Sequence, residues 1–165
     1  MKKYEFTGET KEIRLLFRTA TLHRIRATVA FGIVEVGDLG GWIEKEENLS
    51  HEGKAWVCGD AKVCGDAEVW GNAKVCGDAK VFSASHVLVI GAIGSRNDFT
   101  TFYRDKDNEI TVKCGCFLGK IDRFLEKVIQ THGDSKYALV YRAAVEVAKL
   151  QIDLSGEAPK DADEE

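Results

Sequence analysis

The stretch that decides the fold runs from residue 55 to residue 90 and reads AWVCGD AKVCGD AEVWGN AKVCGD AKVFSA SHVLVI, one pattern repeated every six residues. Every unit carries a valine, from Val57 to Val87, and in the first five units an alanine stands two residues before it. Residues two apart in an extended segment face the same side, so each alanine and valine should point inward together. Gly-Asp or Gly-Asn follows in four units and supplies the permissive backbone that a sharp turn requires. The repeat therefore predicts a coil with three faces and roughly 18 residues per turn.

Such a coil predicts which residues stack on one another. The expected pairs are Val57 with Val75, Val63 with Val81, Val69 with Val87 and, on the outside, Cys58 with Cys76. The unit resembles that of the hexapeptide-repeat family, in which a small residue stands four positions after an aliphatic one, as Ala61 follows Val57. The resemblance implies a short left-handed β-helix.

The flanking segments predict a mainly β protein with a small α+β lobe. Residues 99–104 and 109–117 alternate as two strands of a hairpin. Apolar residues from Phe117 to Ile129 fall at helical spacing, and a second helix begins near Ser135. We expect a ββαα lobe after the β-helix. The expected regions are 1–54, an N-terminal hairpin and cap; 55–94, the hexapeptide-repeat β-helix; 95–153, the C-terminal ββαα lobe; and 154–165, a disordered acidic tail.

Composition limits the classes of partner. The 165 residues carry 23 basic and 27 acidic side chains, and the excess acid lies in the tail, so the overall charge gives no support for nucleic-acid binding. No apolar run reaches the roughly 18 residues that cross a bilayer, and the N-terminus has no secretory pattern. Five cysteines without an export signal predict reduced thiols. These features together favour a soluble protein of the cytoplasm.

The segment GDLGGWIEKEENLS, residues 37–50, adds a second resemblance. Together with the six-residue repeat it resembles repeat proteins carried in bacteriophage and prophage genomes, most of which have no assigned activity. The resemblance covers about residues 1–150. It implies a viral origin and carries no chemistry with it.

The junction after the repeat offers the most suggestive set of side chains. It combines hydroxyl, amide, guanidinium and aromatic groups, which suit an anionic ligand that carries a base. The predicted ligand-binding residues are Ser95, Arg96, Asn97, Thr101 and Tyr103 from the junction, with Cys116 and His132 from the same lobe. An ordinary junction turn followed by an exposed strand is the alternative.

The cysteines and histidines give weaker signals. Cys114-Gly115-Cys116 with His132 lacks the second ligand pair of a zinc site, so we expect packing roles, with no metal and no cofactor. His86 is the one histidine within the repeat that an acyltransferase of this type would use as a base, yet a solvated face explains it as well. The outward row of cysteine, tryptophan and phenylalanine predicts subunit contacts and a homo-oligomer, with a trimer as the expected form. This row comprises Cys58, Cys64, Trp70, Cys76 and Phe82.

Three functional hypotheses follow. The preferred one is a non-enzymatic, oligomeric phage binding protein that captures a small anionic, nucleotide-like ligand. In an infected cell it would be an anti-defence sponge that sequesters a nucleotide-derived immune signal of the host. The second is a protein-interaction module that inhibits a host defence protein, and the third is a hexapeptide-type acyltransferase.

Overall fold

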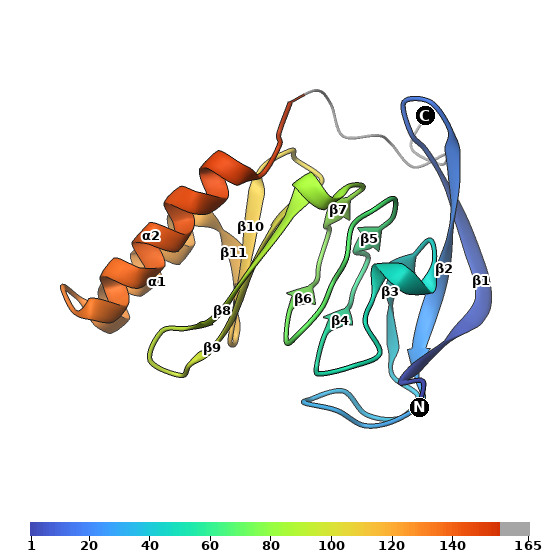
Figure 1. The fold of residues 1–165 in the computed structure, drawn as a ribbon, viewed down its shortest axis with the longest axis horizontal. Helices are drawn as coiled ribbons and strands as arrows, with labels where there is room; N and C mark the ends of the chain where they lie inside the picture. Colours follow the sequence, from blue (N-terminus) through green and yellow to red (C-terminus); the bar gives the residue numbers. More distant parts are fainter. Residues whose placement is uncertain (156–165) are drawn as a thin grey trace.

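The computed structural model describes residues 1–155 of the chain. Its strands form a five-stranded mixed sheet in the order β1-β2-β3-β5-β7, a four-stranded antiparallel sheet in the order β11-β10-β9-β8, and the pair β4-β6 (Figure 1). The strands are β1 (Tyr4–Arg14), β2 (Thr19–Ala27), β3 (Leu39–Ile43), β4 (Trp56–Val57), β5 (Lys62–Val63), β6 (Lys74–Val75), β7 (Lys80–Val81), β8 (Val87–Ile93), β9 (Asp98–Arg104), β10 (Ile110–Cys114) and β11 (Phe117–Lys120). The helices are η1 (Glu46–Asn48), η2 (Ala84–His86), α1 (Ile121–His132) and α2 (Lys136–Gln151).

The expected left-handed β-helix is wrong as a description of this fold. The repeat strands divide between two sheets: β5 and β7 extend the sheet that β1, β2 and β3 begin, whereas β4 and β6 pair separately. No closed solenoid forms within residues 1–155. The physical reason is that the third expected pair, Val69 with Val87, does not form. Val69 bridges Leu49, and Val87 pairs with Tyr103 instead. Val87 begins a strand that leaves the repeat, so the third face is never completed.

Two of the three predicted valine registers are nevertheless present. Val57 pairs with Val75 and Val63 pairs with Val81, both in parallel strands. All four side chains are fully buried in one hydrophobic core together with the alanines of the repeat. Gly59 and its counterparts in the next three units have φ values between 63° and 69°, a conformation that glycine adopts without strain.

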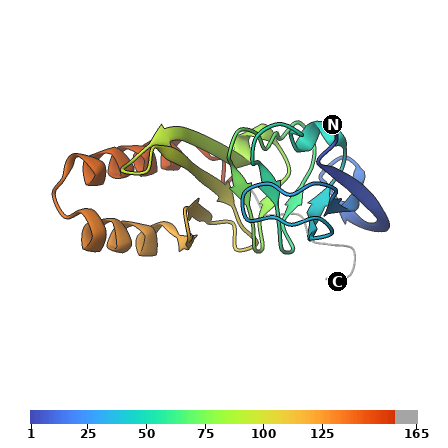
Figure 2. The ribbon, with the colours of Figure 1, turned by 90° about the horizontal axis from the view of Figure 1, so that it is seen from below.

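The expected ββαα lobe is also wrong, because four strands precede the two helices. The apolar run VLVIGAI, which continues the repeat in sequence, forms β8 and pairs with β9. Phe117, expected both at the end of the strand 109–117 and at the start of the helical spacing, begins β11 instead and pairs with Cys114 across the two-residue loop Gly115–Cys116. Gly115 has a φ of 57°, as the first position of such a loop requires. Helices α1 and α2 then cover one face of this sheet, as Figures 1 and 2 show, and build a second core.

Two further expectations concern the ends and exterior of the chain. Of the predicted disordered tail, 154–165, residues 156–165 lie outside the described part of the chain. Within residues 1–155, none of the helices combines the length and the apolar character needed to cross a membrane.

Replacing Val75 with Asp should abolish cooperative folding. Val75 is fully buried at the centre of the repeat core, and an unpaired carboxylate there costs at least about 3 kcal/mol, a large part of a typical stability. Thermal denaturation followed by circular dichroism measures the effect. Glu68→Gln, at an exposed position of the preceding unit, is the control and should melt like the wild type. A Val75→Asp variant that melts cooperatively within a few degrees of wild type would contradict this account of the core.

Candidate ligand-binding site

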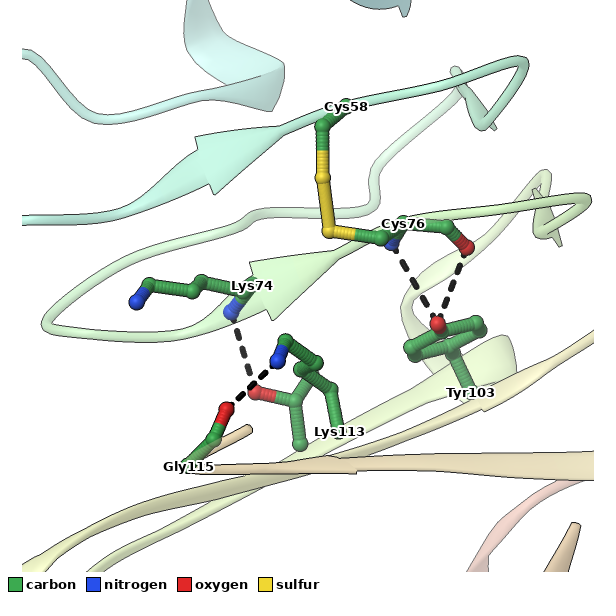
Figure 3. The surroundings of a disulfide bond; sticks show 7 residues. Cys58, Lys74, Cys76, Tyr103, Lys113 and Gly115 are labelled. Atoms are coloured by element: carbon green, nitrogen blue, oxygen red, sulfur yellow. Dashed lines mark hydrogen bonds between the residues drawn. A yellow bond between two sulfur atoms is a disulfide. The ribbon is translucent and has the colours of Figure 1, made fainter. Parts of the chain in front are cut away.

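Side chains of strand β9 form hydrogen bonds with the backbone groups at the open edge of the repeat (Figure 3). The Tyr103 hydroxyl donates to the carbonyl oxygen of Cys76 at 2.9 Å and accepts the Cys76 amide at 3.3 Å. The Thr101 hydroxyl accepts the backbone amide of Lys74 at 3.1 Å. Burial raises the pKa of Tyr103 well above its ordinary value, so the hydroxyl stays protonated. Thr101 and Tyr103, predicted to bind a ligand, therefore satisfy the backbone of β6.

The cysteines of the repeat differ from the expectation of five reduced thiols. Cys58 and Cys76 form a disulfide between the two strands that the repeat stacks (Figure 3). Cys64 is fully buried, and burial raises the pKa of its thiol to about 12, which leaves it unreactive. Phe82 is also buried, and the Arg104 guanidinium lies over its ring. The predicted outward row of contact residues is thus largely internal.

A pocket of about 120 Å³ opens in the C-terminal lobe between the sheet and the helices. It lies where the turn after β8, the loop between β10 and β11, and the inner faces of α1 and α2 come together. Four predicted site residues line it, namely Ser95, Arg96, Cys116 and His132. Asn97, with a φ of 54°, belongs to the same turn but does not line the pocket.

Aromatic rings form the floor and one wall of the pocket. Phe124 packs edge-on against Tyr141, with ring centroids 5.7 Å apart, and Phe117 lies 5.4 Å from Phe124. The His132 ring stacks on Tyr141 at 5.6 Å. The interior is therefore apolar and flat-walled, as suits a ring-shaped ligand group.

The polar groups inside the pocket contact one another. The Thr100 hydroxyl donates to the Cys114 sulfur at 3.5 Å. Burial, and next the neighbouring Cys114, raise the pKa of Tyr141 to about 12, while Arg96 acts in the opposite direction. Gly94, with a φ of 79°, lies against the Tyr141 hydroxyl, and a side chain there would collide with it.

Two cations stand at the rim of this apolar space, and the Asp98 carboxylate, which accepts the Phe99 amide at 2.7 Å, lines the pocket as well. Arg96 comes from the turn after β8 and Lys127 from α1, and both are exposed. Within residues 1–155, neither forms a salt bridge with a carboxylate. The Arg96 guanidinium lies so close to Gly115 that a Cβ atom at this position would come within 2.7 Å of Nη1. The Lys113 ammonium donates to the Gly115 carbonyl at 2.5 Å and holds that loop (Figure 3).

Most of the other lining residues were not predicted from the sequence, and three of them shape the site. Phe124, Lys127 and Tyr141 lie on helices whose spacing predicts a core-facing side, and this side also faces the pocket. The available signal was Lys127 itself, since it stands three residues after Phe124 and so shares a helical face with an apolar residue.

His86, the candidate base of an acyltransferase, has a structural role. Its Nδ1 accepts the backbone amide of Phe82 at 3.1 Å. Burial, and next the nearby Arg104, lower the pKa of His86 to about 4. The ring is therefore neutral at pH 7 and weakly basic.

No protein-family model matches this chain, and no curated protein matches it.

Protonation of His86 should destabilise the fold in acid. Its pKa falls from 6.5 to about 4, so the unfolded chain takes up the proton first as the pH drops. The stability from this group is complete above pH 6.5 and is lost as the pH falls toward 4. We expect a loss of about 1–2 kcal/mol, after discounting for partial exposure. Urea titrations at a series of pH values measure it. His86→Asn, which keeps an acceptor, should lose less stability over this range, and equal pH dependence in both proteins would contradict the assignment.

Removing the Tyr103 hydroxyl should weaken the link between the repeat and the four-stranded sheet. Tyr103→Phe leaves the amide and the carbonyl of Cys76 without that partner, which costs about 1–3 kcal/mol. Chemical denaturation measures the free energy of unfolding. Tyr137→Phe, on the exposed side of α2, is the matched control and should change it by less than about 0.5 kcal/mol. If the two variants have the same free energy of unfolding, the hydrogen bonds from Tyr103 to Cys76 do not stabilise the edge of the repeat.

Proposed function

We propose that this protein binds a small anion that carries a flat apolar ring, and that the pocket between the four-stranded sheet and α1 holds it. One observation carries the proposal: Arg96 and Lys127 stand at the rim of a pocket with an aromatic interior, and neither has a carboxylate partner among the described residues. An anionic group at the rim would pair with both cations. A ring below it would pack against Phe117 and Phe124.

The size of the pocket limits the ligand. A cavity of about 150 Å³ in a protein core admits benzene, and this pocket has about 120 Å³. The pocket therefore holds at most one ring, and the rest of a larger ligand stays at the rim. The guanidinium of Arg96 suits a phosphate or carboxylate, since its planar fork donates two parallel hydrogen bonds. A nucleotide with its base in the pocket and its phosphate at Arg96 meets both conditions.

Binding without turnover is the form of function that we favour. The acyltransferase hypothesis required His86 as a base, but its pKa near 4 and its bond to Phe82 oppose that role. Stoichiometric capture needs no such base. The resemblance to phage-encoded repeat proteins supports a setting in which the captured ligand is a nucleotide-derived immune signal of the host.

One observation favours the second hypothesis, inhibition of a host protein. Leu16 and Phe17, at the tip of the β1–β2 hairpin, are 86% and 94% exposed. Two adjacent apolar side chains at such a tip suit insertion into a pocket of another protein. A stable complex with one host protein that Phe17→Ser abolishes, while Arg96→Ala leaves it intact, would support this alternative.

Arg96→Ala should weaken ligand binding with little effect on stability. The expected loss is about 1.5–3 kcal/mol, the scale of a hydrogen bond to a charged group, which is roughly 10- to 150-fold in Kd. Mass spectrometry of small molecules released from the purified protein identifies the ligand. Calorimetric titration with that ligand, or with adenosine monophosphate as a first probe, measures Kd.

Two controls make this test specific. Arg142→Ala removes an exposed charge from α2 outside the pocket and should leave Kd unchanged. Adenosine, which lacks the phosphate, should bind the wild type and Arg96→Ala equally. Equal losses in both arginine variants would indicate a diffuse electrostatic effect, and no loss at Arg96 would remove this pocket as the site.

A further inference from the structure

One buried polar side chain lines the candidate pocket although packing does not require its hydroxyl. Thr100 is 1% exposed and stands two residues before Phe102 on β9, so both side chains lie on the face that the helices cover. Phe102 belongs to the apolar core there. A buried hydroxyl costs free energy unless it forms a good hydrogen bond, and a valine would fill the same space without that cost. Packing alone therefore does not account for a threonine at this position.

The hydrogen bond that this hydroxyl donates is a weak one. Its acceptor is the Cys114 sulfur at 3.5 Å, and a thiol sulfur is a poor acceptor. The Tyr141 hydroxyl meets the same thiol, and burial, followed by Cys114, raises the pKa of Tyr141 to about 12, so it too keeps its proton. Two protonated hydroxyls thus face one sulfur inside the pocket. A carbonyl oxygen or a ring nitrogen of a ligand would be a stronger acceptor for either of them.

Thr100 lies deeper in the pocket than the rim cation Arg96. Thr100 pairs with Cys114 in the sheet, whereas the Arg96 guanidinium lies against Gly115, in the loop that follows Cys114. From Asp98, the first residue of β9, to Thr100 the strand advances about 7 Å into the sheet. An anionic group bound at Arg96 therefore directs an attached ring toward the Thr100 hydroxyl.

We propose that the ring held by this pocket is a pyrimidine base and that the Thr100 hydroxyl contacts its polar edge. The inference rests on the proposed function and names the ligand class of the same site. The pocket volume of about 120 Å³ is close to the roughly 150 Å³ that admits benzene, so one six-membered ring fits and a bicyclic purine does not. Uracil and cytosine each present carbonyl oxygens and ring nitrogens at the edge of one ring. A hydroxyl can donate to these atoms or accept from them, so it serves both bases.

Calorimetric titration of the full chain with three monophosphates separates ring size from ring polarity. Uridine monophosphate carries one polar ring, adenosine monophosphate carries two fused rings, and phenyl phosphate carries one ring without a polar edge. Uridine monophosphate should bind at least about 10-fold more tightly than adenosine monophosphate, because only one ring of the purine can enter. This comparison on the wild type needs no variant.

Thr100→Val tests the hydroxyl itself. It should weaken the binding of uridine monophosphate about 5- to 150-fold, because a polar atom of the base is then buried without its partner, and leave the Kd of phenyl phosphate unchanged. Thr100→Ser keeps the hydroxyl and should retain the preference for uridine monophosphate. Thr21→Val, at an exposed position of β2 outside the pocket, is the matched control and should bind both ligands like the wild type.

Two outcomes would overturn this inference and leave the proposed function intact. One is an affinity for uridine monophosphate no higher than that for adenosine monophosphate, with both dependent on Arg96. The other is a Thr100→Val variant that weakens uridine monophosphate no more than phenyl phosphate. If none of the three monophosphates binds the wild type, the proposed function and this inference fail together.

Discussion

The two hydrogen bonds between the Tyr103 hydroxyl and the backbone of Cys76 are the interaction on which the arrangement of this protein depends. A parallel stack of two-residue strands ends in an edge whose amides and carbonyls need partners. A third coil would supply them in a longer repeat. Here Tyr103 supplies them with one side chain, since its hydroxyl both donates to and accepts from Cys76. Thr101 accepts the amide of Lys74 in the same way, and the repeat ends there.

The alternation of side chains along β9 links this seal to the pocket. Thr101 and Tyr103 point toward the repeat, so Thr100 and Phe102 point toward the helices. Phe102 packs edge-on against Phe124 in the second core, and Thr100 donates to Cys114 inside the pocket. One strand therefore closes the repeat with one face and builds the wall of the candidate site with the other. A shift of its register by one residue would destroy both.

The sequence predicted the strand pairings that depend on the strict six-residue period of the repeat. Val57 over Val75 and Val63 over Val81 follow from an unbroken six-residue spacing. The third pair failed because Val87 opens the run VLVIGAI, and a short apolar run suits a repeat unit and an ordinary strand equally well. The proximity of Cys58 and Cys76 was predictable from the same spacing, but their disulfide was not, because an assumption about the redox compartment set the expectation. At the pocket, Arg96 was predicted from the junction and His132 from the same lobe, whereas Lys127 was missed because periodicity assigns its helix to the core.

Two glycines explain how the cation and the rings of the pocket come together before any ligand binds. Gly94 lets the Tyr141 hydroxyl approach the backbone of one turn, and Gly115 lets the Arg96 guanidinium lie against the next. The first turn is joined to β9 and the second to β10, which are neighbours in the same sheet, so their separation is fixed by backbone hydrogen bonds. Sites held by such elements lose little conformational freedom on binding, and more of the interaction energy then appears as affinity. An arginine without a carboxylate partner contributes little to stability at an exposed rim, so the stability of the fold does not account for the position of Arg96.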